Sequence, residues 1–426
     1  MVGVSRREFM SLAGLLGVAL VLRLGWGLLQ PAVIDERLPD QREYLELAEN
    51  LIAGEGLWFY DPRFYQDVKA FRTPGYPVFL AALGANVRAA RAAQALLDVS
   101  TVLAAYLLAR KWMGHWPSFM AAFLVAFNPF LVYFSGLILT ETLYTAMLAW
   151  GMVLLAWERN FLWGGLVLAV SVLVRPSAVL LTVALGYAAV FATRVPGEID
   201  TKRRPWMRVP VGATMLVLTA LVLTPWAVRN KTVVGTWVVL TTNGGVTKYD
   251  GFHPEADGSS DQRFLATKEF ATLRQLNEVQ RDRVLSEKAN EWIRQTWRER
   301  PRDLMKLTLL KVARTWSPVP LSDDFGSRWI YRAAALAFSI PFYLLVVVGL
   351  WTGPRKGGLS GWGKLFLLTP AVYFTLVHAM TVGSLRYRVP VEPLLAVLAA
   401  SGVMVIGAQF RPPEWKRAGE GADPKI

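Results

Sequence analysis

Ionisable and aromatic side chains gather in a polar stretch that follows the first apolar segment of the chain. Asp40 and Tyr44 open an amphipathic run, and Arg72 and Tyr76 stand where the next apolar segment begins. Ionisable residues held at a membrane boundary are costly and usually functional. A carboxylate here could take the proton of an attacking hydroxyl, and a guanidinium could bind a phosphate through its planar fork. Asp35, in the same stretch, is the alternative carboxylate for the base.

Four further charged residues border or interrupt apolar segments later in the chain. Arg386 and Arg388 lie in the turn between the last two apolar segments, on the side where basic residues are unusual, and an anionic lipid phosphate would explain them. Glu141 begins an apolar segment, where a carboxylate needs a partner or a proton. We place Glu141 nearer the cytoplasmic side, away from the polar stretch. Arg175 lies inside a long apolar stretch and is a further candidate for phosphate binding.

Each of these residues also has a structural interpretation. Asp40 followed by Glu43 fits a capping box, and the cap alone would stabilise a helix by roughly 1 kcal/mol. Arg72 could extend its charged end to the membrane interface, and Arg386 could anchor a turn there. The carboxylate of Glu141 would be stabilised by the helix dipole if a helix begins at that residue.

The composition is that of a membrane protein with many helical spans. The chain has 426 residues, of which 54% are hydrophobic. Several apolar runs of about 20 residues are each long enough to cross a hydrocarbon core. The net charge of +14 fits basic loops between spans and contact with anionic lipid headgroups, so nucleic acid is not indicated as a partner. We therefore expect an all-α, polytopic fold.

The residue types that bind most protein metals and cofactors are scarce. Cysteine is absent, which excludes disulfides, thiolate catalysis and cysteine-bound metals. The three histidines are far apart in sequence, so no histidine spacing supports a metal site. No glycine-rich loop of the P-loop or Rossmann type occurs. No cofactor is therefore indicated with certainty, although the acidic residues of the first polar stretch could hold a divalent ion.

Ten apolar spans are predicted, the second short and the sixth interrupted at Arg175-Pro176, as either one bent helix or a tight pair. They cover 9–29, 74–87, 92–110, 116–135, 137–157, 162–192, 209–228, 329–351, 364–381 and 389–409. The lysine and arginine bias of the short loops puts both termini in the cytoplasm and the protein in a bacterial inner membrane. This orientation puts Arg88 and Arg91 in the cytoplasm and leaves Arg110-Lys111 outside as an exception.

Two polar segments then lie on the outward side and divide the chain. Residues 1–228 form an N-terminal transmembrane region, and its loop 30–73 carries the amphipathic helix and the candidate base. Residues 229–328 are too polar to span and form an outward helical cap. Residues 329–409 form a second transmembrane region, followed by a cytoplasmic tail at 410–426.

A set of short motifs runs in order through the chain. These are Asp40 four residues before Tyr44, Arg72-Thr73-Pro74-Gly75-Tyr76-Pro77, Asn128-Pro129 with Thr140-Glu141, Arg175-Pro176, Pro225-Trp226 with Arg229-Asn230, Asn243-Gly244-Gly245 to His253-Pro254, and Arg386-Tyr387-Arg388 with Pro390. In this order they resemble the GT-C superfamily of integral-membrane glycosyltransferases, which use polyprenyl-phosphate sugars. The most similar families are the protein O-mannosyltransferases and the lipid A aminoarabinose transferases. The chain departs from them at Gln41, where an acidic residue often follows the catalytic aspartate.

The resemblance implies a GT-C-like fold and transfer of a sugar from a polyprenyl-phosphate donor to an acceptor on the outward side. It implies Asp40 or Asp35 as the general base, Arg72, Arg386 and Arg388 at the donor phosphate, and inversion of the anomeric carbon. A lipid, a glycan or a protein could be the acceptor, since all present hydroxyls or amines. A lipid or solute transporter is the alternative function, and it would favour inverted repeats with paired broken helices. The chain has one such break without a counterpart, which favours the transferase.

Overall fold

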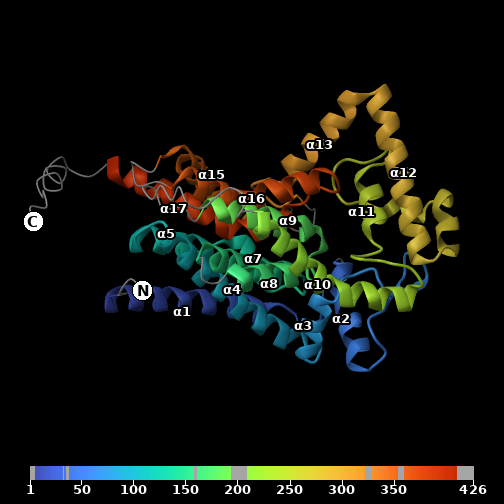
Figure 1. The fold of residues 1–426 in the computed structure, drawn as a ribbon, viewed down its shortest axis with the longest axis horizontal. Coiled ribbons are helices and arrows are strands. Elements are labelled where there is room, and N and C mark those ends of the chain that lie inside the picture. The colour runs from blue at the N-terminus through green and yellow to red at the C-terminus, as the bar shows by residue number, and fades with distance from the viewer. Residues whose placement is uncertain are drawn as a thin grey trace, which may run out of the picture.

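Apolar helices form a bundle, and polar helices form a cap at one end of it (Figure 1). The computed structural model describes residues 5–31, 33–34, 38–157, 161–192, 209–321, 329–353 and 359–409. The bundle helices are α1 (Arg6–Leu29), α4 (Val87–Arg110), α5 (His115–Ala126), α6 (Pro129–Ser135), α7 (Glu141–Ala156), α8 (Phe161–Ser171), α9 (Val179–Ala192), α10 (Val209–Val234), α15 (Trp329–Trp351), α16 (Gly361–Ala379) and α17 (Glu392–Gln409).

The remaining elements lie at the end of the bundle where the cap stands. We call residues 235–315 the cap; it contains α11 (Gly244–Gly251), α12 (Glu278–Glu299) and α13 (Pro301–Thr315). The first loop contributes α2 (Pro39–Ile52), β1 (Phe59–Asp61) and β2 (Gln66–Val68), and α3 (Gly75–Ala82) follows it. Short 3-10 turns occupy Pro176–Ala178, Gln262–Ala266, Lys268–Gln275, Leu385–Tyr387 and Val389–Val391.

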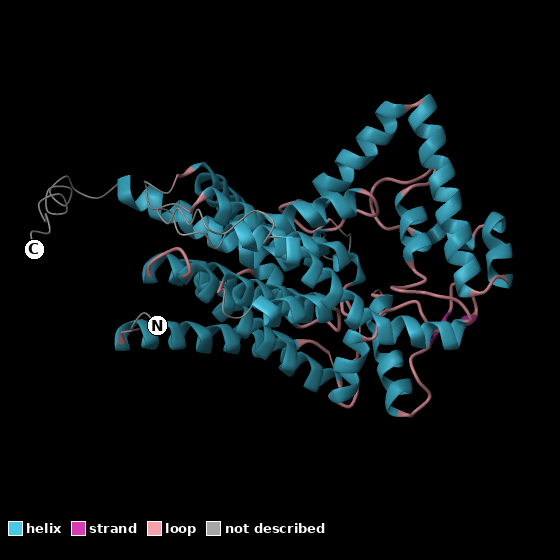
Figure 2. Ribbon diagram, in the orientation of Figure 1, coloured by secondary structure: helices cyan, strands magenta, loops and turns pink. Residues whose placement is uncertain are grey.

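Helices make up nearly all of the regular structure (Figure 2). The strands β1 and β2 form one short antiparallel pair, with Phe59 opposite Val68. Within the part of the chain that the structure describes, five helices are long and apolar enough to cross a membrane, and the bent pair α5–α6 raises the number to six. The helices α7, α8 and α9 are apolar but shorter. The predicted all-α, polytopic fold is confirmed, while the count of ten spans stays a prediction.

The direction of the first helices follows from side-chain contacts at their ends. The described ends of the chain lie together at one end of the bundle, the terminal end, and the cap lies at the opposite one, the cap end (Figure 1). Arg91, near the start of α4, donates to the carbonyl oxygens of Gln30 and Pro31, just after α1. Beyond the far end of α4, the His115 ring lies 3.9 Å from the Glu8 carboxylate near the start of α1. The helix α4 therefore runs from the cap end to the terminal end.

The predicted span at 74–87 is wrong, and this reverses the side of the loops that follow it as far as α8, after which the pair α8 and α9 restores the predicted sides. The helix α3 has only 8 residues, and the chain turns at Gly84, where φ is 67°. The segment therefore stays at the cap end. Arg88 and Arg91 lie there too, not with the termini as predicted. Arg110-Lys111 lies at the terminal end together with the basic N-terminal segment and is no exception to the charge bias, whereas Arg88 and Arg91 now are.

A break between α5 and α6 bends the chain by 52°. Pro129 has no N–H to donate to the preceding turn. The N–H of Phe130 donates instead to the side chain of Asn128, at 2.9 Å. The last carbonyl groups of α5 therefore lose their helical partners and need other donors, because an unpaired buried carbonyl is costly.

Arg23 of α1 supplies those donors from inside the bundle. Its guanidinium donates to the carbonyl oxygen of Ala126 at 2.7 Å and to that of Val125 at 3.0 Å. Its Nε donates to the carboxylate of Asp98 in α4, at 2.5 Å. Both charged side chains are fully buried. One ion pair thus joins α1, α4 and the broken end of α5.

The predicted sixth span is a pair of helices, α8 and α9, with the break at Arg175-Pro176. Just before this break, the carbonyl oxygen of Leu173 accepts a hydrogen bond from the N–H of Gly75, at 2.8 Å. A Cβ at Gly75 would lie 2.7 Å from that oxygen, so only glycine fits there. The contact fixes the start of α3 against the turn that carries Arg175.

Candidate functional site

The helix α2 turns two carboxylates and an aromatic ring toward the bundle. Tyr44 and Leu47 are buried on this face. The helix begins at Pro39 and has no side-chain cap. The predicted capping box is therefore wrong, because the carboxylates of Asp40 and Glu43 contact arginines instead.

Asp40 bridges two arginines that are far apart in the sequence. Its Oδ1 accepts a hydrogen bond from Nη2 of Arg72 at 2.6 Å, and its Oδ2 accepts one from Nη1 of Arg386 at 2.9 Å. The side chain of Asp40 is 24% exposed and that of Arg386 is 27% exposed. The structure therefore brings these three predicted site residues together where a ligand can reach them.

Glu141 joins the same cluster from the first turn of α7. Its Oε1 accepts a hydrogen bond from Nε of Arg386, at 2.7 Å, and lies 3.8 Å from Nη1 of Arg175. The side chain of Glu141 is fully buried. Its predicted position, on the side of the two termini, is wrong, because that prediction counted 74–87 as a span. Glu141 lies at the cap end, in contact with the candidate site.

Three buried polar atoms in this region have no hydrogen-bond partner. They are Oε2 of Glu141, Nη1 of Arg175 and Nε2 of His378. The His378 ring stacks on that of Tyr387, with 3.5 Å between the centroids. The Arg175 guanidinium lies 5.4 Å from the centre of the same Tyr387 ring. Tyr387 directly follows Arg386 in the sequence. Since buried polar groups are normally hydrogen-bonded, this corner of the site suits a polar ligand.

Glu43, expected from the sequence only as part of a helix cap, also lies in the candidate site. Its Oε2 accepts hydrogen bonds from Nε and Nη2 of Arg72, at 2.8 and 2.5 Å, and its Oε1 accepts one from Arg63 at 3.1 Å. Arg63 also binds the buried Asp61. One sequence signal could have found Glu43, since it lies three residues after Asp40, on the same helix face.

The charges of this cluster balance. Its members are Arg63, Arg72, Arg175 and Arg386 with Asp40, Glu43, Asp61 and Glu141. Arg386 is the member that touches carboxylates of both α2 and α7. An anion that binds Arg72 or Arg386 must therefore compete with a carboxylate.

Tyr44 and Tyr76 pack behind the cluster. Their rings meet edge to face, with 5.0 Å between the centroids. The guanidinium of Arg72 lies 5.3 Å from the centre of the Tyr44 ring, which adds a cation–π contact. The hydroxyl of Tyr76 donates to Gln94 of α4 at 2.6 Å. Tyr44 therefore contacts Arg72 directly, and Tyr76 supports the Tyr44 ring.

Gln41, the departure from the GT-C motif, has a structural role. Its side chain is buried, and its Oε1 accepts a hydrogen bond from the N–H of Ile138 at 2.9 Å. Ile138 lies in the turn that leads into Glu141. The amide next to Asp40 thus joins the first loop to the start of α7.

The structure does not bring Arg388 to the cluster, although the sequence predicted it at the donor phosphate. Arg388 is buried, its Nε donates to Glu392 at 2.8 Å, and its Nη1 donates to the carbonyl oxygen of Ser317. Its guanidinium also lies 4.6 Å from the centre of the Phe130 ring. With its charge paired and covered, Arg388 fixes the start of α17. Asp35, the alternative base, lies outside the described residues.

The carboxylates of Asp40 and Glu43 have pKa values shifted in opposite directions. Burial raises the pKa of Asp40, but the positive charges of Arg72 and Arg386 outweigh it and hold that pKa well below its usual range. Burial, opposed by the charge of Arg72 and assisted by that of Asp40, leaves the pKa of Glu43 above its usual value. Asp40 is thus ionised but a weak base while both arginines contact it.

No metal-binding group emerges from the residues that the structure describes. Among them, no three aspartate, glutamate or histidine side chains come together in a way that could hold a metal ion. The carboxylates nearest the candidate site each contact an arginine. The expectation that acidic residues of the first loop could hold a divalent ion stays untested, because Asp35 and Glu36 lie outside the described part.

The cap fixes the segment that leads to Arg72. Glu278, in the first turn of α12, accepts hydrogen bonds from the N–H groups of Lys69 and Ala70, each at 3.1 Å. Its carboxylate also accepts one from the hydroxyl of Thr242, at 2.8 Å. A single side chain of the cap thus holds two consecutive backbone groups of the first loop, two residues before Arg72.

Replacement of Glu278 by alanine is expected to lower activity without removing any group of the cluster. The loosened backbone would let Arg72 shift, and a shift of about 1 Å can cost roughly 100-fold in rate. Steady-state kinetics should show a lower kcat for Glu278→Ala. Glu278→Gln should retain part of the wild-type kcat, because its amide keeps one acceptor oxygen. Glu287→Ala, at an exposed position on the same helix, is the control. A kcat equal to that of the wild type would contradict this positioning role.

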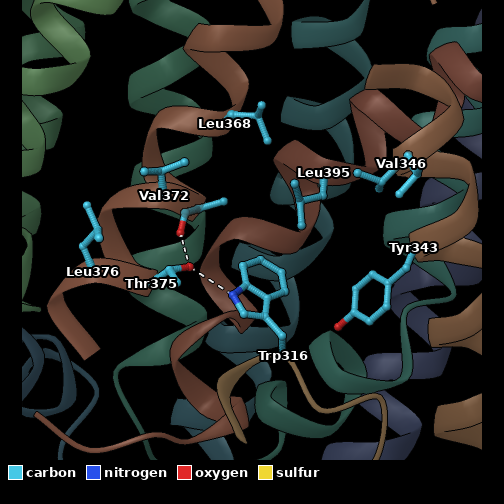
Figure 3. Close-up of a pocket in the computed structure, with 10 residues that line it drawn as sticks. Trp316, Tyr343, Val346, Leu368, Val372, Thr375, Leu376 and Leu395 are labelled. Atoms are coloured by element: carbon cyan, nitrogen blue, oxygen red, sulfur yellow. Dashed lines mark hydrogen bonds between the residues drawn. The ribbon is translucent and has the colours of Figure 1, made fainter. Parts of the chain in front are cut away.

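An apolar cavity of about 410 Å³ opens among α15, α16, α17 and the end of α13 (Figure 3). Its lining includes Trp316, Tyr343, Val346, Leu368, Val372 and Leu395. The indole N–H of Trp316 donates to the hydroxyl of Thr375 at 3.0 Å, so these two polar groups are satisfied. A cavity with such walls favours hydrocarbon over water.

Comparison with known proteins gives one family match and several similar folds. Residues 77–227 match the family model of the dolichyl-phosphate-mannose-protein mannosyltransferases. No curated protein matches the chain. The archaeal oligosaccharyltransferase AglB from Archaeoglobus fulgidus, in complex with an inhibitory peptide and a dolichol-phosphate, is similar with a TM-score of 0.57 and 14% sequence identity. The similarity covers 99% of this chain and 53% of that one, so the chain spans about half the length of this relative.

Two further solved structures are similar. The same archaeal oligosaccharyltransferase in the apo form has a TM-score of 0.56 and 13% identity, and covers 98% of this chain and 52% of that one. ArnT from Cupriavidus metallidurans, bound to undecaprenyl phosphate, has 15% identity and a TM-score of 0.37, with 95% of this chain and 81% of that one covered. The likeness to the oligosaccharyltransferase is one of fold, and it extends over nearly the whole of this chain.

Proposed function

Because the chain has the fold of the GT-C membrane glycosyltransferases, we propose that it transfers a sugar from a polyprenyl-phosphate donor to an acceptor. The observation that carries this proposal is the carboxylate of Asp40, partly exposed between Arg72 and Arg386. The family match and the dolichol-phosphate in the AglB structure support a lipid-phosphate donor. The acceptor is a hydroxyl or amine of a lipid, a glycan or a protein.

The donor phosphate binds beside Arg386 and Arg175. Nη1 of Arg175 and Nε2 of His378 are buried without hydrogen-bond partners, and Arg386 is partly exposed. Arginine binds phosphate through two parallel N–H groups, which gives both energy and orientation. Glu141 holds the Nε side of Arg386 at 2.7 Å and leaves its terminal nitrogens to turn toward the phosphate.

Binding of the donor prepares Asp40 as the general base. The phosphate competes with Asp40 for Arg386, and loss of that contact raises the basicity of the carboxylate. Asp40 then takes the proton of the acceptor as the acceptor oxygen or nitrogen bonds to the anomeric carbon. The bond from that carbon to the phosphate oxygen breaks, and the phosphate leaves with its electron pair beside the arginines. Attack opposite the leaving group inverts the anomeric carbon.

The lipid chain of the donor follows the apolar side of the bundle. The cavity among α15, α16 and α17 has apolar walls (Figure 3), and α16 also carries His378 near its end at the cap. A prenyl chain placed there would have its phosphate end toward the cluster. The cap end then faces outward from a bacterial inner membrane, and both termini face the cytoplasm.

Transfer of a labelled sugar tests the proposal directly. Purified protein in lipid vesicles would be incubated with radiolabelled polyprenyl-phosphate sugars and a panel of lipid, glycan and peptide acceptors. We expect label to move to one acceptor class and free polyprenyl phosphate to appear in equal amount. Movement of intact donor across the bilayer, with no transfer to any acceptor, would instead identify a transporter.

The pH dependence of the reaction should show that donor binding releases Asp40. In the free enzyme its pKa is lowered, so the stabilising charge pairs are present above the unfolded value of about 4. These charge pairs are lost only when the pH falls through the pKa of Asp40 in the folded protein, which is lower still. We therefore expect the acid limb of kcat/KM to show no contribution from Asp40 above about pH 4. The acid limb of kcat, which reports the donor complex, should lie at higher pH.

Profiles of kcat and KM measured over the acid range would check this difference. Asp67→Asn, at an exposed position in the same loop, should leave both limbs unchanged. If the acid limbs of kcat and kcat/KM lie at the same pH, Arg386 remains paired with Asp40 when the donor binds. The proposed competition between the phosphate and Asp40 then does not occur.

A further inference from the structure

The hairpin formed by α12 and α13 exposes large apolar side chains outside the bundle. Trp297, Met305, Leu309 and Leu310 are between 41% and 66% exposed. Exposed apolar side chains are expected on bundle helices that face lipid, but they are unusual in a polar cap. A contiguous apolar patch on a polar segment marks an interaction surface.

Three of these side chains, Met305, Leu309 and Leu310, lie on the exposed side of α13, and Trp297 lies near the end of α12. Met305 and Leu309 are one helical turn apart, so they stand one above the other. Leu307 and Lys311, on the opposite face, are buried. The apolar face is therefore distinct from the face by which α13 packs onto the rest of the protein.

Contacts at the end of α13 attach it to the cap end of the bundle. Trp316, just after α13, donates to Thr375 of the bundle helix α16 at 3.0 Å. Lys311 packs against Gly383, which follows α16. From this attachment the hairpin projects sideways past the outline of α15, α16 and α17, and α13 forms the arm nearer to the bundle (Figure 1). The hairpin thus overhangs the ring of lipid around those helices.

The charge of the hairpin fits a lipid surface. Between residues 294 and 310, the exposed basic side chains are Arg294, Arg298, Arg300, Arg302 and Lys306, and the exposed acidic ones are Glu299 and Asp303. Arg302 and Lys306 share the exposed face of α13 with the apolar residues. Apolar and tryptophan side chains with flanking arginine and lysine are typical of helices that lie in the headgroup region.

We propose that the exposed face of α13, with Trp297, docks into the headgroup region of the bilayer leaflet at the cap end, and that anionic lipids strengthen this contact. The occupant is lipid because the face is attached at the level where the bundle leaves the membrane, overhangs the lipid, and carries positive charge. The proposal does not depend on the reaction that the protein catalyses. Because Glu278 at the start of α12 binds the first loop, the docked hairpin would also hold the segment before Arg72 at a fixed height above the membrane.

Spin labels at single cysteines test the contact, and the natural absence of cysteine means that each label has one site. Met305→Cys and Leu309→Cys place labels on the proposed face, and Glu287→Cys places one on an exposed position of α12. The full-length protein would be reconstituted in nanodiscs of phosphatidylcholine with and without phosphatidylglycerol. Collision with oxygen reports the hydrocarbon side, and collision with a water-soluble nickel chelate reports water.

We expect the oxygen-to-nickel collision ratio at 305 and 309 to be several-fold higher than at 287. This ratio should rise further with phosphatidylglycerol, and the rise should be lost in Arg302→Gln/Lys306→Gln carrying the same label. Equal ratios at all three positions would show that the hairpin stands in water and would overturn the proposal. Protection of 305 and 309 from both reagents would overturn it as well, since a protein partner or a second copy would then cover the face.

Discussion

Asp40→Asn is expected to reduce sugar transfer by about 100-fold or more, because a missing general base costs roughly 100- to 10,000-fold. The amide keeps the size of the side chain and can still accept a hydrogen bond from Arg72 or Arg386. The cluster should therefore stay assembled while the proton acceptor is lost. The measurement is single-turnover transfer from a radiolabelled polyprenyl-phosphate sugar, in vesicles with equal amounts of folded protein.

The control for Asp40→Asn is Asp67→Asn in the same first loop. Asp67 is exposed on β2, so its amide variant should transfer sugar at the wild-type rate. Wild-type activity in Asp40→Asn would mean that Asp40 only holds the two arginines. The base would then be Asp35, or Glu43, whose pKa is raised by burial but whose carboxylate is occupied by Arg72 and Arg63.

Arg23→Met is expected to destabilise the protein by about 3–5 kcal/mol, because it leaves the charge of Asp98 buried and unpaired. It also removes the donors to the carbonyl groups of Val125 and Ala126 at the end of α5. The thermal unfolding midpoint in detergent should fall sharply relative to the wild type. An unchanged midpoint would show that water or another donor replaces the guanidinium at no cost.

The double variant Arg23→Met/Asp98→Leu separates the two parts of this loss. Replacing both partners of a buried ion pair by apolar residues is often neutral, so most of the midpoint should return. The carbonyl groups of α5 would still lack Arg23, and full recovery is therefore not expected. A double variant as unstable as Arg23→Met alone would assign the whole effect to those carbonyl groups.

The sequence predicts the helical, multi-pass fold well, because apolar runs of sufficient length have few other stable forms. It predicts sides less well, because the wrong span at 74–87 reverses the sides of the loops that follow it until the pair α8 and α9, predicted as either one bent helix or a tight pair, restores them. The run at 74–87 is apolar, yet it contains the tight contact at Gly75 and the turn at Gly84, and it never crosses. For this reason Glu141 was placed away from the site in which it lies.

Within the site, the sequence identifies those residues that stand in a recognisable short motif. Asp40, Arg72 and Arg386 stand in motifs, and the structure brings them together. Arg388 stands in the same motif as Arg386, but its side chain points to Glu392, one helical turn later, and packs inside. Arg63 and Asp61 follow no such pattern, because their partners are fixed by the turn between β1 and β2 and by tertiary contacts alone.

The distance along the chain between Asp40 and Arg386 sets the moment at which the protein becomes complete. The two side chains form an ion pair although 346 positions separate them. At a synthesis rate of about 5–20 residues per second, on the order of tens of seconds pass between their emergence from the ribosome. During that interval Asp40 and Arg72 have been made but Arg386 has not. A partly inserted chain therefore holds the proposed base without its second arginine, and the ion pair can form only with the last pair of helices.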